Sequence, residues 1–320
     1  MKLITILIPA YNEEDVLDQL YDRLSHVISG IPDYEFELLF VNDGSKDRTI
    51  DIIRELRKLD NRVSFVDLSR NFGKEIAMGA GFDYARGDAV IILDADLQDP
   101  PEIIPEMIKY WEEGYDDVYA KRRNREGETW FKKWTASQFY KILQKTTRIP
   151  IQENTGDFRL LDRRCIEALK KIRETQRYTK GMFSWIGYNK KEILFDRDPR
   201  AAGETKWNYW KLTELAVEGI TSFTTFPLRI SSFVGFFISV IAFVYMIWII
   251  FKTLVFGEEV AGYPSMMVII LFLGGIQLLS LGILGEYLGR VFNETKQRPL
   301  YFVDEYNEEK VNVGKREVSR

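Results

Sequence analysis

Cysteine and histidine are nearly absent from this chain of 320 residues, which contains one of each, Cys165 and His26. A single cysteine cannot form an internal disulfide or a cysteine-based zinc site, and such usage fits a reducing compartment. A surface position on a helix accounts for His26, so carboxylates must carry any proton transfer. The net charge of −4 lacks the basic excess of a general nucleic-acid-binding protein, and we expect no nucleic-acid partner.

Short apolar runs alternate with segments of helical spacing along the first part of the chain. The runs predict strands, and the segments between them predict helices, at Leu3–Ile8, Glu13–Ser29, Phe36–Val41, Asp47–Asp60, Val63–Leu68, Glu75–Arg86 and Ala89–Leu93. Strands separated by helices favour the α/β class with a mostly parallel sheet. Ligands bind at the carboxyl edge of such sheets.

The most informative motif follows the last of these strands. It reads Asp94-Ala95-Asp96-Leu97-Gln98-Asp99-Pro100-Pro101. An Asp-x-Asp pair at a carboxyl edge offers hard oxygen ligands to Mg²⁺ or Mn²⁺, which in turn hold phosphate oxygens. A helix cap is the alternative, because Asp before Pro-Pro-Glu also begins helices, and Asp99 fits that role.

Two other strand ends carry polar sets, Pro9–Glu14 and Val41–Asp47. Turns and caps explain each set alone, but the three together predict one pocket at the carboxyl edge. A fourth set, Ser69–Glu75, adds cationic partners for a diphosphate in Arg70 and Lys74. We reject a dinucleotide fingerprint at Gly79-Ala80-Gly81, because these glycines fall inside a predicted helix.

Two uncharged runs, Ser231–Phe251 and Pro264–Gly285, are each close to the roughly 20 residues that a membrane-crossing helix requires. A buried helix pair in a soluble core is the alternative. The basic residues that flank the runs predict a multi-pass topology with both ends cytoplasmic. Small residues within the runs are compatible with self-association, and we expect a homo-oligomer.

These observations divide the chain into four parts. We expect an α/β domain at 1–210, a juxtamembrane segment at 211–229, two transmembrane helices within 230–288 (about 231–251 and 264–285) and a cytoplasmic tail at 289–320 that frays from 308. Aromatic and basic residues mix in Trp130–Trp134 and Lys206–Lys211, which predicts contact with membrane lipids at the headgroup level.

Several of these motifs resemble those of a known family. Ile8–Glu14, Val41–Ser45 and Asp94–Glu102 resemble the GT-A-fold family 2 glycosyltransferases. Ser69–Glu75, Asn154–Arg159 and Thr205–Trp210 look like those of the polyisoprenyl-phosphate glycosyltransferases, and most like bacterial bactoprenol glucosyltransferases of the GtrB type. With the two apolar runs, the resemblance covers nearly the whole chain, and it is less specific for the sugar.

The resemblance implies a Rossmann-like GT-A domain and an inverting, metal-dependent transfer of one sugar, glucose first, from a UDP-sugar to undecaprenyl phosphate. The reaction would occur at the cytoplasmic face of a bacterial cell membrane, and the lipid-linked sugar would serve surface glycan modification. The chain lacks the Gln-x-x-Arg-Trp motif of processive synthases, which favours transfer of a single sugar. Other donors (N-acetylglucosamine, galactose or GDP-mannose) and a catalytically inactive membrane scaffold are the alternatives.

The resemblance also implies roles for individual residues. The uridine would lie against Pro9, Ala10, Tyr11, Glu13 and Asp43, with Asp94 facing the nucleotide, while Asp96 and Gln98 would hold Mg²⁺ or Mn²⁺ and Asp157 would be the catalytic base. Our candidates for the phosphates of donor and acceptor are Arg122, Lys133 and Lys206. Because a phosphate monoester is largely dianionic at neutral pH, Asp157 could instead orient a substrate or help hold the metal.

Overall fold

The computed structural model describes residues 1–123, 152, 155–175, 177–196, 226–256, 262–307 and 309–311. The chain forms two compact units. The sheet unit comprises Met1–Glu214 and Pro299–Arg320, and the helical unit comprises Leu215–Arg298. Lys133, Lys206 and the two segments predicted to meet lipid headgroups lie outside the described residues.

A sheet of nine strands is the centre of the described part of the sheet unit. In spatial order the strands are β7 (Lys190–Phe195), β5 (Asp117–Arg122), β6 (Thr155–Asp162), β4 (Ala89–Ile92), β1 (Lys2–Ala10), β2 (Tyr34–Asn42), β3 (Val63–Leu68), β8 (Val303–Tyr306) and β9 (Glu309–Lys310). The central strands β4, β1, β2 and β3 are parallel, whereas β6 is antiparallel to β4 and β8 is antiparallel to β3. The four predicted strands and their parallel arrangement are confirmed.

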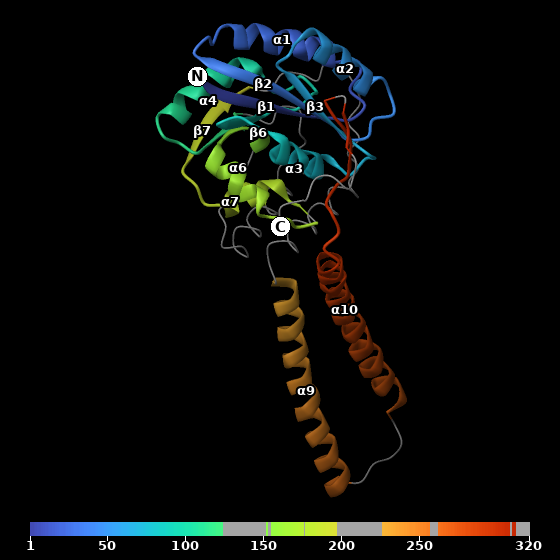
Figure 1. Ribbon diagram of the computed structural model, residues 1–320. Coiled ribbons are helices and arrows are strands. Elements are labelled where there is room, and N and C mark those ends of the chain that lie inside the picture. The colour runs from blue at the N-terminus through green and yellow to red at the C-terminus, as the bar shows by residue number, and fades with distance from the viewer. Residues whose placement is uncertain are drawn as a thin grey trace. The chain divides into compact units, whose positions relative to one another are not determined.

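Helices cover both faces of this sheet (Figure 1). One face packs against α1 (Leu17–Ser29), α2 (Thr49–Leu59) and α4 (Ile104–Glu112), and the short helix η1 (Pro101–Ile103) directly precedes α4. The other face packs against α3 (Lys74–Tyr84) and α6 (Arg163–Lys170). Helix α7 (Thr179–Trp185) follows α6 in the chain. Alternate residues of β1 serve the two faces, since Ile4, Ile6 and Ile8 join the first core and Leu7 meets α3. Burying each such side chain contributes about 1.5–3 kcal/mol.

Glycine at position 81 allows α3 to approach the sheet. A Cβ atom there would overlap the side chain of Leu7. Gly81 lies in the interior of α3, as does Gly79, where a Cβ atom would make an ordinary contact of 3.5 Å with the guanidinium carbon of Arg177. Both glycines lie inside a helix, in agreement with the rejection of a dinucleotide fingerprint.

The chain returns to the sheet after its second long helix. Strand β8 extends the sheet at β3, with Val66 opposite Tyr306 and Leu68 opposite Val303. The sequence analysis placed these residues in a tail and predicted no strand. Four residues with a single aliphatic side chain carry too little periodicity to predict a strand, and the edge of β3 provides the pairing.

Two long helices, α9 (Phe226–Phe256) and α10 (Tyr263–Thr295), run side by side in the helical unit (Figure 1). The two uncharged runs lie within them. Among the described residues, Phe272–Thr295 is long and apolar enough to cross a membrane, and Ile230–Tyr245 is a shorter apolar helix. Helix formation is confirmed for both runs, and two membrane crossings stay a prediction.

Candidate active site

The loops after β1 and β2 are joined by hydrogen bonds at the carboxyl edge of the sheet. The Asn12 N–H donates to Ser45 Oγ at 3.0 Å, and the Lys46 N–H donates to Asn12 Oδ1 at 2.8 Å. The Glu13 N–H donates to Thr49 Oγ1 at 2.9 Å. Two of the predicted polar sets therefore form one continuous surface.

Asp43 holds the loop that precedes α3. Its carboxylate is 3% exposed and accepts the N–H groups of Phe72 at 2.7 Å and Gly73 at 2.9 Å. Burial raises the pKa of Asp43, and these two donors oppose that rise. Gly44 has a φ of 63°, and a Cβ atom there would overlap the backbone of Arg70. Asp43 thus organises the loop, and its role in uridine binding stays a prediction.

The other predicted uridine contacts lie at the end of β1. Ala10 is buried, Pro9 and Glu13 are half-buried, and Tyr11 is 37% exposed. An exposed aromatic ring at this edge offers a face on which a planar base can stack. The structure brings these residues together, and their contact with the uridine stays a prediction.

Asp94, Asp96 and Gln98 share the open side of the turn after β4. Ala95 and Leu97 between them are buried, and Leu97 adopts a positive φ of 59°. The Gln98 N–H donates to Asp96 Oδ1 at 3.2 Å, which fixes the turn. The N-cap position of η1 is Pro100, so neither Asp94 nor Asp96 occupies that position.

The oxygen donors of this turn fit a Mg²⁺ or Mn²⁺ ion. Carboxylate and amide oxygens are ligands that both ions accept. Within the described residues, no group of three acidic, histidine or cysteine side chains is placed to hold a metal. An ion on Asp96 and Gln98 would therefore complete its shell with water or with oxygens of a diphosphate.

The antiparallel pairing of β6 with β4 brings Asp157 to the same edge. Arg159 pairs with Ile92, so Asp157 falls opposite Asp94 two residues further along. The Lys74 ammonium lies 2.7 Å from Asp157 Oδ2 and 2.7 Å from Asp94 Oδ1. One lysine at the start of α3 thus bridges two of the predicted site carboxylates.

Lys74 sets the charge state of Asp157. Burial raises the pKa of Asp157, but the charge of Lys74, helped by Lys180, outweighs burial and holds the pKa at about 2. Conversely, burial lowers the pKa of Lys74, and the two carboxylates raise it well above its ordinary value. Asp157 is therefore ionised at neutral pH. Its carboxylate can accept hydrogen bonds from a cationic or hydroxylic group.

Glu75 and Lys180 belong to the same cluster, and sequence reasoning missed both. The Thr179 N–H donates to Glu75 Oε2 at 3.1 Å. Burial, together with the charge of Asp157, raises the pKa of Glu75 to about 8, so its carboxyl is largely protonated at neutral pH. Burial also lowers the pKa of Lys180, against the opposing charge of Asp157. The place of Glu75 at the start of a helix, within the polar set Ser69–Glu75, could have pointed to it, whereas nothing in the sequence singles out Lys180.

Arg122 is the described member of the three phosphate candidates. A Cβ atom on Gly156, the neighbour of Asp157, would lie 3.6 Å from Arg122 Nη2. The guanidinium therefore lies beside Gly156, and burial, helped by the charge of Arg122, lowers the pKa of Lys180. The other two candidates, Lys133 and Lys206, fall outside the described residues, and their role stays a prediction.

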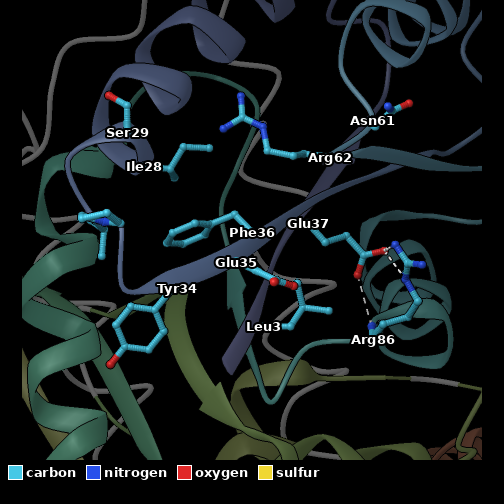
Figure 2. A pocket seen from close by; sticks show the side chains of 12 residues that line it. Leu3, Ile28, Ser29, Tyr34, Glu35, Phe36, Glu37, Asn61, Arg62 and Arg86 are labelled. Atoms are coloured by element: carbon cyan, nitrogen blue, oxygen red, sulfur yellow. Dashed lines mark hydrogen bonds and ion pairs between the residues drawn. The ribbon is translucent and has the colours of Figure 1, made fainter. Parts of the chain in front are cut away.

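A cavity of about 500 Å³ lies at the opposite, amino edge of the sheet (Figure 2). Its lining includes Glu37, whose carboxylate accepts hydrogen bonds from Thr5 Oγ1 at 2.7 Å, Ser64 Oγ at 3.2 Å and Arg86 Nε at 2.7 Å. Buried and surrounded by donors, this carboxylate is a structural group. The carboxyl edge therefore remains the candidate active site.

The sheet order and the carboxylate-bearing strand ends define the GT-A fold of a glycosyltransferase. The chain belongs to glycosyl transferase family 2, which matches residues 5–170, and the GtrB C-terminal hairpin matches residues 226–291. The family resemblance, the fold class and the assignment as an enzyme are confirmed.

Two relatives match almost end to end. An uncharacterized glycosyltransferase of Synechocystis sp. is 52% identical over 302 residues, which cover 94% of this chain and 95% of that one. The bactoprenol glucosyl transferase of Shigella phage SfX is 47% identical over 300 residues, which cover 94% and 98%. Among solved structures, mannosyl-3-phosphoglycerate synthase from Rubrobacter xylanophilus gives a TM-score of 0.47 at 17% identity, over 68% of this chain and 71% of that chain.

Proposed function

We propose that this glycosyltransferase moves a single glucose from UDP-glucose to undecaprenyl phosphate, with inversion and with Mg²⁺ or Mn²⁺. The observation that carries the proposal is the Asp94–Lys74–Asp157 bridge beside the Asp96–Gln98 turn. This arrangement supports a metal site and an acceptor site that lie next to each other. The names of the relatives, bactoprenol glucosyl transferases among them, support the lipid acceptor and the sugar.

On the donor side, Asp96 and Gln98 would hold the divalent ion. A bound Mg²⁺ or Mn²⁺ would supply positive charge against the negative charge that develops on the leaving UDP. The loop held by Asp43 and the exposed ring of Tyr11 accept the uridine, together with Pro9, Ala10 and Glu13. Asp94, already joined to Lys74, faces the same nucleotide.

On the acceptor side, Asp157 orients the lipid phosphate for in-line attack on the anomeric carbon. The phosphate is largely dianionic at neutral pH, so it needs little help from a base. A carboxylate beside a phosphate is repulsive unless cations lie between them, and Lys74 and Arg122 meet that need. Attack opposite the leaving group inverts the sugar carbon, as a direct displacement requires. Lys133 and Lys206 are further candidates for the phosphates.

The helical unit keeps the enzyme at its lipid substrate. In this proposal α9 and α10 cross the bacterial cell membrane, both ends are cytoplasmic, and the sheet unit meets UDP-glucose in the cytosol. The glucosylated lipid then serves surface glycan modification. Membrane lipids and further copies of the chain are the expected partners.

A donor panel tests this proposal. The purified full-length chain in lipid nanodiscs is given undecaprenyl phosphate and UDP-glucose, UDP-N-acetylglucosamine, UDP-galactose or GDP-mannose, with Mg²⁺, Mn²⁺ or EDTA. We expect mass spectrometry to find one hexose on the lipid with UDP-glucose, and none with EDTA. Another preferred donor would overturn the choice of glucose, EDTA-resistant transfer would overturn the metal, and no transfer from any donor would favour the scaffold alternative.

A further inference from the structure

The segment Tyr301–Asn307, called the strap below, contains β8 and lies between the helical unit and the end of the chain. We infer that the strap positions the donor-site loop before α3 and thereby acts in donor binding. The expected change in donor KM rests on the proposed function. Its structural basis is a set of contacts on both ends of one loop–helix segment, Ser69–Tyr84.

The first contacts lie where this segment begins. The Ser69 N–H donates to the Phe302 carbonyl at 3.0 Å, and Leu68 pairs with Val303. The next residues form the loop whose N–H groups at Phe72 and Gly73 bind Asp43. The strap therefore fixes the backbone at the entrance of the loop.

Further contacts lie where the segment ends. The Tyr301 hydroxyl donates to Asp83 Oδ2 at 2.7 Å, and the guanidinium of Arg173 binds the same carboxylate at 2.7 and 2.9 Å. The rings of Tyr84 and Tyr306 have their centroids 4.8 Å apart. Because α3 carries Lys74 at its other end, anchoring Asp83 and Tyr84 restricts the helix that delivers this ammonium to Asp94 and Asp157.

A third contact connects the strap with the loop after β2. Glu305 accepts from Arg54 Nη2 at 2.5 Å, and the same nitrogen lies 3.9 Å from Asp67 Oδ2. Asp67 in turn accepts from Asn42 Nδ2 at 2.7 Å, and Asn42 Oδ1 accepts from Ser45 Oγ. The strap thus contacts the entrance of the loop before α3 directly, and it is connected to the loop after β2 through Arg54, Asp67 and Asn42.

Protection of a sheet edge is the simpler role for an added strand, since it covers the exposed groups of β3. That role predicts a loss of stability, and no specific loss of donor affinity, when the strap is loosened. Two double variants of the full-length chain separate the two roles. Tyr301→Phe/Glu305→Gln removes one tyrosine–carboxylate hydrogen bond and one arginine–carboxylate pair from the strap.

The matched control is Tyr34→Phe/Arg23→Gln, which removes the same kinds of contact at sites outside the proposed machinery. Tyr34 donates to Glu112 at 2.8 Å, and Arg23 binds Glu102 at 2.7 and 2.8 Å. The measurements are the donor KM, kcat and Tm of each variant, and hydrogen exchange at the amides of Phe72 and Gly73. Where the strap double variant does not fold, Tyr301→Phe against Tyr34→Phe gives the same comparison.

We expect the strap variant to raise the donor KM about fivefold, the factor for one lost net hydrogen bond, with kcat nearly unchanged. Exchange at Phe72 and Gly73 should become faster than in the control, at similar Tm. Equal KM and equal exchange in the two variants would overturn the inference. If the unmodified chain transfers no sugar, the proposed function fails, and the exchange comparison still decides whether the strap positions the loop.

Discussion

Carboxylates at the two edges of the sheet have different hydrogen-bond and ion-pair partners. At the amino edge, Glu37 is 2% exposed, and hydroxyls of β1 and β3 and the guanidinium of Arg86 surround its two oxygens. At the carboxyl edge, the side chain of Asp157 is 13% exposed and meets the ammonium of Lys74, which Asp94 also contacts. Glu37 is thus bound by donors from the sheet and from Arg86, whereas Asp157 and Asp94 share the ammonium of one flexible lysine.

This difference distinguishes a structural group from the candidate functional group. Two buried hydroxyls and a guanidinium satisfy the carboxylate of Glu37 and hold β1, β2 and β3 together. A lysine shared by two carboxylates can move its contact when a diphosphate or a phosphate arrives, because its stem is flexible and its ammonium is a point charge. The comparison predicts that substitutions at the two edges affect different properties.

The largest expected effect is on turnover, from Asp157→Asn. Turnover should fall about 10²–10⁴-fold, the range for loss of a positioned catalytic group, while donor binding stays near that of the unmodified chain. UDP release gives the rate, and isothermal titration gives the donor affinity. Glu37→Gln at the amino edge is the matched control and should retain its turnover. If Asp157→Asn retained most of its activity, Asp157 would not act in turnover, and the functional difference between the two edges would be wrong.

The next effect concerns the metal. Asp96→Asn should weaken UDP-glucose binding at least about tenfold in Mn²⁺ or Mg²⁺, the lower range seen when metal-site groups are lost. EDTA should weaken binding to the unmodified chain and leave little difference between it and the variant. Titration with and without EDTA measures this. Donor binding that is insensitive to both changes would contradict a metal site at this turn.

A smaller effect, on stability alone, is expected at the amino edge. Glu37→Gln replaces a charged acceptor for Arg86 and leaves donors of Thr5 and Ser64 with a poorer partner, which should cost about 1–3 kcal/mol. Thermal unfolding of the full-length chain should show a lower Tm, with unchanged kcat and donor KM. A loss of donor affinity without a loss of Tm would mean that the amino edge, and not only the carboxyl edge, takes part in function.

Much of this arrangement could be predicted from the sequence. Apolar runs with polar ends predicted the four central strands, and parallel pairing predicted that Tyr11, Asp43 and Asp94 meet at one edge. These are local patterns with a simple geometric consequence. The resemblance to the family, and not this pattern, assigned Asp43 to the uridine. In the structure both its oxygens accept N–H groups of the loop before α3, and the uridine contact stays a prediction.

Other features depend on pairings between distant segments. The bridge by Lys74 requires the antiparallel register that sets Asp157 opposite Asp94, and no local pattern encodes a register. The strand β8 pairs with β3 across more than 200 positions of the chain, and its sequence has no strand signal of its own. The protonated state of Glu75 follows from burial beside Asp157, which only the folded chain brings about.

A separate effect, on the pH dependence of stability, tests that state of Glu75. Its pKa is about 8 in the folded chain, against about 4.3 in an unfolded one, so the folded chain binds the additional proton between these values. The contribution of protonated Glu75 to the free energy of unfolding is therefore fully present below about pH 4.3, and it is lost as the pH rises through 8. Asp157, with a folded pKa of about 2, contributes stability above about pH 3.9 and loses it on acidification, outside this window.

The variant Glu75→Gln separates these two carboxyl groups. It keeps an oxygen for the Thr179 N–H and removes the titration, so its Tm should fall less than that of the unmodified chain between pH 5 and pH 8. The opposing charges nearby, Lys74 and Lys180, are the same in both proteins, so the difference between the two Tm curves reports Glu75. Parallel curves would mean that Glu75 is ionised at neutral pH, and that its pKa in the folded chain is not raised.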